Sequence, residues 1–120
     1  MLLDGRPHRD DKHLDREWFY DRLRHVTERP TTAAPAPREF EEAYTELARD
    51  GADEILALVT ASTVSSIYDH ATLAASSFGS LPVHVVDTTQ ITMGLGWLVV
   101  EAAQQLAGGA VVPEVVEAVS

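Results

Sequence analysis

Two short apolar runs predict the strands of this protein. Residues 54–60 (EILALVT) are apolar nearly throughout, which is typical of a strand covered on both faces. In residues 81–87 (LPVHVVD), Val83, Val85 and Val86 form a β-branched run too short for a helix. Each run leads through a hydroxyl-bearing loop into a helical pattern. The chain therefore repeats a unit of strand, hydroxyl loop and helix.

Apolar residues at spacings of three and four predict the helices. Asp15 is expected to cap a helix that runs to about Thr27, and Pro37 to open a helix over residues 37–49. A third helix follows Ser66, and a short last one covers residues 113–119. The helix opened by Gly94 and Gly96 is apolar on two sides, because Trp97 and Val100 lie off the stripe of Leu95, Leu98, Val99, Ala102 and Leu106. We expect that helix to be covered on both sides.

The alternation of strands and helices predicts a parallel sheet with right-handed crossovers. Only two strands are clear, with Leu2 and Leu3 before an Asp4-Gly5 turn as the remnant of a third. Two parallel strands alone are marginal. The predicted fold class is therefore α/β, with a partial parallel sheet flanked by helices and incomplete at both ends, the further strands coming from another chain or from a longer protein.

Charge is distributed unevenly along the chain. There are 19 acidic and 9 basic residues, and every Lys and Arg lies at or before Arg49. The residues after Arg49 therefore have no Lys or Arg side chains with which to bind phosphates, which disfavours nucleic acid and anionic membrane surfaces as partners. Hydroxyls and backbone amides remain for binding an anion. No apolar stretch is long enough for a membrane span, and Met1–Gly5 is too short for a signal peptide.

Cysteine is absent, which excludes disulfides and zinc–thiolate sites and is consistent with a cytoplasmic location. His8, Asp10, Asp11 and His13 are metal-ligating types, but their spacing does not place them on one face, and we interpret them as a solvated loop. No metal or cofactor is expected.

Hydroxyl side chains gather in two loops. Thr31 and Thr32 begin the rigid, proline-rich segment 30–37, and four more follow the first predicted strand. In an open α/β sheet, ligands bind where strand ends lead into helix starts, so Asp87–Gly96 is expected to form one wall of a site. Helix capping accounts for one of the four hydroxyls. These four are Ser62, Thr63, Ser65 and Ser66.

Ser65, His70 and Asp87 could be combined into a hydrolytic triad. The G-x-S-x-G elbow is missing, and His70 lies five residues after Ser65, nearly half a turn out of phase on the same helix. His84 alternates with core valines and is interpreted as a sheet residue. Asp87 either binds the amides of Thr88 and Thr89 or lines the pocket.

Three motifs carry a resemblance to a known family: PTTAAPAP, ASTVSSIYDHA and VVDTTQITMGLGWLVVEAA. In this order they resemble the N-terminal domain of the DegV family, bacterial proteins that bind a fatty acid. The family blocks read approximately P-x-T-S-Q-P-S, S-S-x-L-S-G-T-Y and V-D-S-x-x-x-S-M-G-L-G. The resemblance implies that residues 1–120 are a partial N-terminal α/β domain, without its first strand and without the entire C-terminal domain.

The resemblance also implies a function. Such proteins hold one fatty acid by its carboxylate on hydroxyls and present it to a fatty acid kinase, without themselves being enzymes. The family's threonine and loop serine correspond to Thr32 and Ser65. This chain departs from the pattern at Ala33, Ala34 and Ser66, and the cationic partners of the carboxylate would lie in the second domain.

The candidate site can be stated as a set. Its carboxylate-binding residues are Thr31, Thr32, Ser62, Ser65 and Ser66, and its pocket wall is formed by Asp87, Met93, Gly94 and Gly96. Thr31 or Thr32 is expected to converge with Ser65, because they lie at the open end of adjacent elements. The alternatives are a hydrolase-like α/β enzyme that uses the Ser/Thr loops, or a truncated remnant without function.

Overall fold

A computed structural model describes residues 2–3, 6–8 and 14–120. The chain forms two compact units, Met1–Ala33 and Ala34–Ser120, each described here by itself. The expected turn at Asp4-Gly5 and the ligand types at Asp10, Asp11 and His13 lie outside the described residues.

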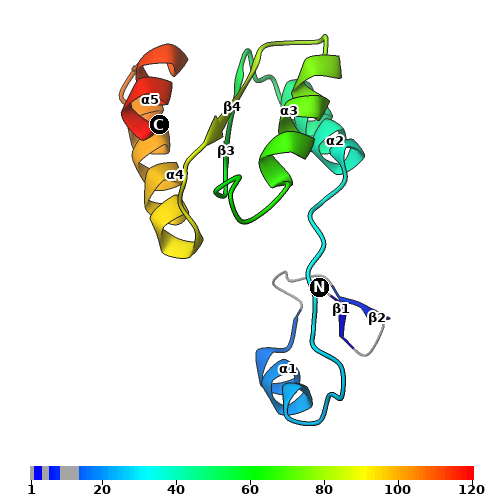
Figure 1. The fold of residues 1–120 in the computed structure, drawn as a ribbon. Coiled ribbons are helices and arrows are strands. Elements are labelled where there is room, and N and C mark those ends of the chain that lie inside the picture. Colours follow the sequence, from blue (N-terminus) through cyan, green and yellow to red (C-terminus); the bar gives the residue numbers. More distant parts are fainter. Residues whose placement is uncertain (1, 4–5, 9–13) are drawn as a thin grey trace. The chain divides into compact units, whose positions relative to one another are not determined.

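Two parallel strands form the centre of the Ala34–Ser120 unit (Figure 1). Strand β3 (Ile55–Val59) pairs with β4 (Val83–Asp87), and the register sets Ile55 opposite Val83 and Val59 opposite Asp87. Both predicted strands are confirmed. Because the strands are parallel and pair residue for residue over their full length, their carboxyl ends lie side by side, at what is called here the carboxyl edge of the sheet.

Helices pack on both faces of this sheet (Figure 1). Helices α2 (Pro37–Arg49) and α3 (Ile67–Ser77) cover one face. Helices α4 (Thr92–Ala107) and α5 (Val112–Val119) cover the other. The α/β class with helices flanking a partial parallel sheet is thus confirmed.

Two apolar clusters hold the layers together, one on each face of the sheet. Burial of apolar side chains is the main driving force for such packing. The buried residues are Tyr44, Ile55 and Ala74 on the α2–α3 face, and Val86, Ala102, Val115 and Val119 on the α4–α5 face.

Strand β3 is less covered than its sequence predicts. Ile55 and Val59 are buried, but Leu56, Ala57 and Leu58 are only half-buried. Among the described residues β3 has β4 as its one strand neighbour, so its outer edge is unpaired. Full burial of a strand requires neighbours on both edges as well as layers on both faces.

Local signals set the ends of α2. Pro37 occupies the first turn, where its missing N–H costs nothing, and the Glu39 carboxylate accepts a hydrogen bond from the Ala36 amide at 2.9 Å. After the helix, Gly51 adopts a φ of +94°, a left-handed conformation that suits glycine. The predicted range of 37–49 is confirmed.

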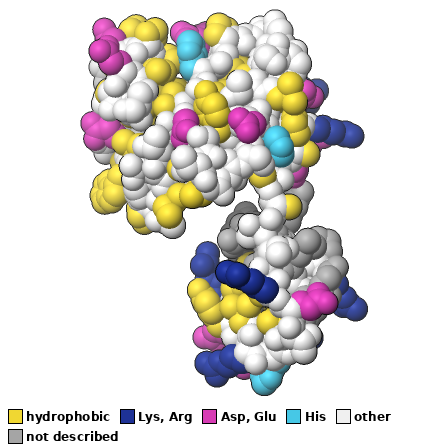
Figure 2. All heavy atoms as spheres, in the orientation of Figure 1, with side chains coloured by type: hydrophobic (Ala, Val, Ile, Leu, Met, Phe, Trp, Pro, Cys, Tyr) yellow, Lys and Arg dark blue, Asp and Glu magenta, His cyan; other side chains and the backbone are white. Residues whose placement is uncertain are grey.

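Helix α4 differs from its prediction in two ways. It begins at Thr92, so Gly94 and Gly96 lie in its first turns rather than at its start. Its second apolar side is not covered within the described part of this unit, since Met93 is 63%, Trp97 67% and Val100 42% exposed. Figure 2 shows hydrophobic side chains gathered at the lower end of α4. The expectation of cover on both sides was wrong here because the sheet and α5 contact only one side.

The described residues of the Met1–Ala33 unit form two short paired strands and one helix. Strands β1 (Leu2–Leu3) and β2 (Arg6–Pro7) pair antiparallel. The predicted strand at Leu2 and Leu3 is therefore confirmed, but the prediction that it is a remnant of the parallel sheet was wrong. A remnant of two residues is too short for its sequence to specify a partner.

Helix α1 (Arg16–Leu23) is capped as expected, because Asp15 Oδ1 accepts a hydrogen bond from the Trp18 amide at 3.1 Å. It ends at Leu23 and not near Thr27. Hydrogen bonds between residues three apart, from the Arg24 amide to Asp21 and from the His25 amide to Arg22, close its last turn. The helix has no buried residue, and Trp18 is 44% exposed beside the His8 ring at 5.3 Å. Because helices in proteins are stabilised mainly by packing of an apolar face, a helix with so little apolar packing is not extended to Thr27.

Candidate functional site at the carboxyl edge of the sheet

Two loops meet where β3 and β4 end. Residues 60–66 join β3 to α3, and residues 88–91 join β4 to α4. This is the edge at which ligands bind in open α/β sheets. Most of the predicted site residues in the Ala34–Ser120 unit lie on these loops or in the first turns of the helices that follow.

Thr88 anchors the second loop to the end of β3. Its amide and its hydroxyl both donate to the carbonyl oxygen of Val59, at 3.2 and 2.8 Å. The side chain is 3% exposed, and its oxygen also accepts a hydrogen bond from the Gln90 amide at 3.3 Å. A buried hydroxyl with both roles satisfied fixes the path of the chain leaving β4.

Gln90 connects the loops through its main chain. Its carbonyl oxygen accepts from the Ala61 amide at 3.0 Å and from the Thr60 hydroxyl at 3.1 Å. Together with the contacts of Thr88, these bonds join the loop after β3 to the loop after β4. The hydroxyl loop is therefore held by the loop after β4.

Asp87 adds a third connection. Its carboxylate accepts from the Ser62 amide, at 3.2 Å to Oδ1 and 3.3 Å to Oδ2, and from the Thr89 amide at 3.0 Å. The pKa of Asp87 is lowered, chiefly by the Ser62 hydroxyl and then by the Thr89 amide, because both stabilise the anion. Of the amides considered for Asp87, the Thr89 assignment is correct and the Thr88 assignment is wrong, since the Thr88 amide points to Val59.

The hydroxyls of the first loop differ in their surroundings. Ser65 is half-buried and its Oγ accepts a hydrogen bond from the Ile67 amide at 3.3 Å, so it supports the start of α3. Ser66 occupies the N-cap position without a side-chain capping bond and is exposed. Ser62 and Thr63 are also exposed. The cluster therefore presents more hydroxyls than the helix uses.

The glycines of the wall leave little room beside them. A Cβ at Gly94 would lie 2.8 Å from Gln90 Oε1, and a Cβ at Gly96 would lie 3.3 Å from Met93 Sδ and Cε.

Thr89 and Thr92 carry positive φ angles of 54° and 51°. Such angles are unusual for β-branched residues and are found where the surrounding structure enforces them.

Thr31 and Thr32 are exposed and belong to the Met1–Ala33 unit. Their convergence with Ser65 stays a prediction. The segment that follows them is held to α3, because His70 Nδ1 lies 2.7 Å from the Pro35 carbonyl oxygen.

The contacts of His70 and Asp87 do not build a triad with Ser65. His70 bonds to Pro35, Asp87 bonds to Ser62 and Thr89, and Ser65 Oγ receives the Ile67 amide. His84 lies in β4 as expected, with Nε2 3.0 Å from Glu54 Oε2.

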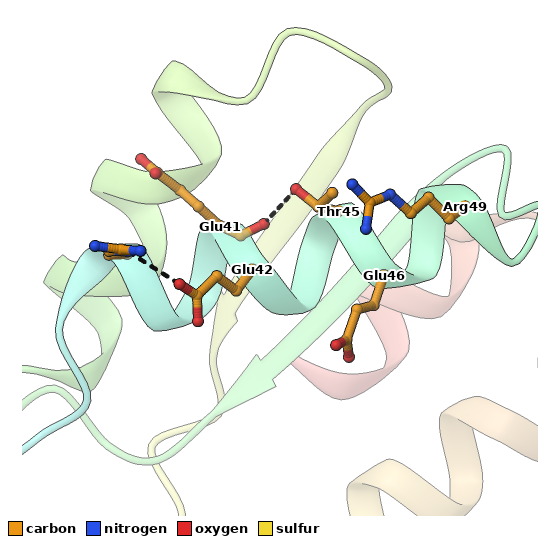
Figure 3. A pocket seen from close by; sticks show the side chains of 6 residues that line it. Glu41, Glu42, Thr45, Glu46 and Arg49 are labelled. Carbon is orange, nitrogen blue, oxygen red and sulfur yellow. Dashed lines mark hydrogen bonds and ion pairs between the residues drawn. The ribbon is translucent and has the colours of Figure 1, made fainter.

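Other hollows lie away from this edge, and two of them are described here. Figure 3 shows one on the outer face of α2, where Arg38 pairs with Glu42 at 2.9 Å and Glu41 lies beside Thr45. Both members of the pair are largely exposed, so this is a solvated helix face. An apolar groove of about 380 Å³ lies between β3 and α4. It is lined by Leu56, Ala57, Leu58, Val99, Ala102, Ala103 and Leu106.

The described residues contain no group of three or more His, Asp or Glu side chains able to hold a metal ion. Within the same part of the chain, none of the helices is both long and apolar enough to cross a membrane.

Sequence reasoning missed Thr88 and Gln90. Thr88 lies in a polar run that reads as solvated loop, yet it is buried, and Gln90 acts through its backbone, which carries no side-chain signal. The one sequence feature that indicates the role of Thr88 is its hydroxyl directly after a strand, where it can bond to nearby backbone groups.

Comparison with known proteins covers the whole chain. A family model described as "Uncharacterised protein, DegV family" matches residues 1–120. A DegV domain-containing protein of Deinococcus radiodurans is 36% identical over 117 residues, which are 98% of this chain and 41% of that protein. The chain thus spans about two fifths of the length of such relatives.

Solved structures agree with this match. A DegV family protein from Thermus thermophilus, described for its fatty acid binding, is 31% identical and superposes with a TM-score of 0.87 over 98% of this chain and 41% of that one. The Streptococcus pneumoniae Fatty Acid Kinase (Fak) B3 protein, loaded with linoleic acid, shares the fold at 23% identity with a TM-score of 0.83, over 98% of this chain and 42% of that one. On the sequence match and the shared fold, the chain belongs to the DegV family.

Proposed function

We propose that this chain supplies the hydroxyl part of the carboxylate site in a fatty-acid-binding protein. The observation that carries the proposal is the pair of joined loops at the carboxyl edge of β3 and β4, which presents serine hydroxyls beside the start of α3. A relative at 31% identity is described for fatty acid binding, which supports the ligand class.

The chemistry suits a single carboxylate. From Gly51 to Ser120 there is no Lys or Arg, so the available donors are neutral hydroxyls and amides. A carboxylate removed from water needs such donors, and hydrogen bonds to a charged acceptor are stronger than neutral ones. We assign these donors to Ser65 and Ser66, with Thr31 and Thr32 contributed by the preceding segment, whereas the Ser62 hydroxyl stabilises Asp87.

Asp87 constrains where the ligand carboxylate can lie. Its own negative charge is stabilised by the Ser62 hydroxyl and by the Ser62 and Thr89 amides, which lower its pKa. A second carboxylate close to it would be repelled. The ligand carboxylate therefore binds on the Ser65 and Ser66 side of the loop, while Met93, Gly94 and Gly96 face the remainder of the ligand.

We further propose that the whole protein presents its bound fatty acid to a fatty acid kinase in the cytoplasm, and that the chain catalyses no step itself. The relative named for a fatty acid kinase and loaded with linoleic acid supports this partner. In this proposal the kinase forms the acyl phosphate, and the hydroxyl site serves to hold the substrate.

Native mass spectrometry of the purified protein tests the proposal. One sample is the 120-residue chain, and a second is a chimera in which the chain replaces the matching residues of the Thermus thermophilus relative. We expect one fatty acid per molecule in the chimera, lost on combining Thr32→Val with Ser65→Ala. A folded chimera that carries no fatty acid, or a double variant that retains it fully, would contradict the assignment.

A further inference from the structure

His70 makes a contact that neither the fold nor the proposed ligand chemistry requires. It lies in the first part of α3 and is half-buried, and its Nδ1 is 2.7 Å from the carbonyl oxygen of Pro35. A carbonyl oxygen only accepts, so Nδ1 carries the proton and donates. The side chain thus holds the segment before α2 against α3.

The packing of α2 on α3 has other supports. The Tyr44 hydroxyl donates to the Ala71 carbonyl oxygen at 3.3 Å, and the Ser77 hydroxyl donates to Glu41 Oε1 at 3.0 Å. Tyr44 is 3% exposed and packs edge-on against Phe78. These contacts join the two helices along their length, so the His70 contact acts on the segment that precedes α2.

That segment continues directly into the two threonines. Thr32 is three residues before Pro35, and three residues of chain span at most about 11 Å. Pro35 also restricts the backbone of Ala34, the residue before it. Holding Pro35 therefore restricts the distance that Thr32 can move from α3.

The loop that carries Ser62, Ser65 and Ser66, here called the serine loop, leads directly into the first turn of α3. The His70 amide donates to the Ser66 carbonyl oxygen at 3.0 Å, and Ser65 Oγ accepts from the Ile67 amide. The contact with Pro35 is thus made one turn along the helix from the serines assigned to the carboxylate.

We propose that His70 is a positioning residue that keeps the threonine segment within reach of the serine loop. It does not touch the ligand, and it acts by reducing the freedom that Thr31 and Thr32 lose on binding. This proposal rests on the proposed function, because it concerns the same site.

Backbone NMR order parameters test the positioning without any ligand. In His70→Ala, we expect the order parameters of residues 31–34 and 36 to fall, while those of α2 and α3 stay unchanged. His70→Asn, whose side-chain amide can donate from about the position of Nδ1, should restore most of the lost order. Unchanged order parameters at residues 31–36, or an equal fall throughout α2 and α3, would overturn the proposal.

A double-mutant cycle tests the link to binding in the fatty-acid-loaded chimera, with oleate as the probe. His70→Ala should raise the dissociation constant about three- to tenfold, and less than about twofold when Thr32→Val is already present. Ser77→Ala, which removes an α2–α3 hydrogen bond elsewhere, is the matched control and should leave the dissociation constant unchanged. An effect of His70→Ala that is the same in both backgrounds would overturn the role of Thr32.

The two proposals fail separately. If the chimera binds no oleate but His70→Ala still loosens residues 31–36, the carboxylate site is wrong and the positioning contact stands. If oleate binds and the order parameters of residues 31–36 do not respond to His70→Ala, the positioning role is wrong and the site stands.

Discussion

The hydroxyl of Thr88 donates a 2.8 Å hydrogen bond to the carbonyl oxygen of Val59, which joins the residue after β4 to the last residue of the neighbouring parallel strand β3. The bond is buried and joins positions 29 residues apart in sequence. It fixes the loop after β4 relative to the loop after β3, and so it sets the geometry on which the proposed site depends.

Thr88→Val should therefore destabilise the fold without changing its shape. The substitution removes one donor and leaves the Gln90 amide without its acceptor, so we expect the free energy of unfolding to fall by about 1–3 kcal/mol. Urea denaturation measures the change. Thr72→Val on the exposed side of α3 is the matched control and should stay within about 0.5 kcal/mol of the parent. Equal losses in both variants would contradict the anchoring role.

Asp87→Asn should alter the pH dependence of stability. The folded-state pKa of Asp87 lies below its ordinary value because the Ser62 hydroxyl and the Thr89 amide stabilise the anion. Stability from this group is thus fully present above the unfolded pKa of about 3.9, and it is lost as the pH falls through the lower folded value.

Thermal melting between pH 2 and pH 7 checks this expectation. The parent should melt above Asp87→Asn at pH 7, and the gap should close below about pH 4. Asp53→Asn, at an exposed position before β3, should follow the parent at pH 7. A gap that persists undiminished at pH 2 would show that the hydrogen bonds of Asp87 do not depend on its charge.

Thr89→Gly should be tolerated, although glycine normally weakens a folded protein. Thr89 holds a φ of 54°, which costs a β-branched residue about 1–2 kcal/mol that glycine does not incur. This relief offsets the extra freedom of glycine in the unfolded chain. We expect a change in unfolding free energy between zero and a gain of about 1 kcal/mol. Thr63→Gly, in the loop after β3, should lose about 0.5–1 kcal/mol. Similar losses at both positions would argue against strain at Thr89.

Gly94→Ala and Gly96→Ala should separate folding from binding. The new methyl groups meet the ends of flexible side chains, Gln90 and Met93, which can move, and alanine favours the helix by about 1 kcal/mol. Melting temperature should hold or rise, whereas fatty acid affinity in the chimera should fall if these glycines line the ligand. Gly79→Ala, with open space around it, is the control. Unchanged affinity in both variants would remove Gly94 and Gly96 from the pocket wall.

Ser65→Ala and Thr32→Val should differ in their effect on folding. Loss of a hydroxyl donor to a carboxylate should weaken fatty acid binding about ten- to hundredfold in each variant. Ser65→Ala should also lower the free energy of unfolding by about 1 kcal/mol, because Ser65 Oγ accepts the Ile67 amide. The exposed Thr32 should have little effect on melting. Loss of stability without loss of affinity would reduce Ser65 to local structure.

The fold could be predicted wherever the signal was local. Pro37 marked the start of α2, and the β-branched run at 83–86 marked a strand, because both depend on neighbours in sequence. Predictions failed where distant contacts decide. The cover of α4 at Trp97 depends on what packs against it, and the pairing of Leu2–Leu3 depends on a register too short to be specified.

The candidate site was predicted by residue type more than by role. Hydroxyls at strand ends indicated the carboxyl edge, and Ser62 and Asp87 are in direct contact there. Their partnership joins atoms 25 residues apart, which no spacing rule gives. The burial of Thr88 was hidden for the same reason, since its polar type favours solvent until the β3 carbonyl is placed beside it.

The bonds that join the two loops have a consequence for how this protein can diverge. The carbonyl oxygens of Val59 and Gln90 and the amides of Ala61 and Ser62 are main-chain atoms, which every residue except proline provides in full. Side chains at 59, 61 and 90 are therefore free to drift as far as these bonds are concerned. Thr60, Ser62, Asp87 and Thr88 contribute through side chains, so an evolving lineage could vary the other positions of this edge while keeping the bonds that join the two loops.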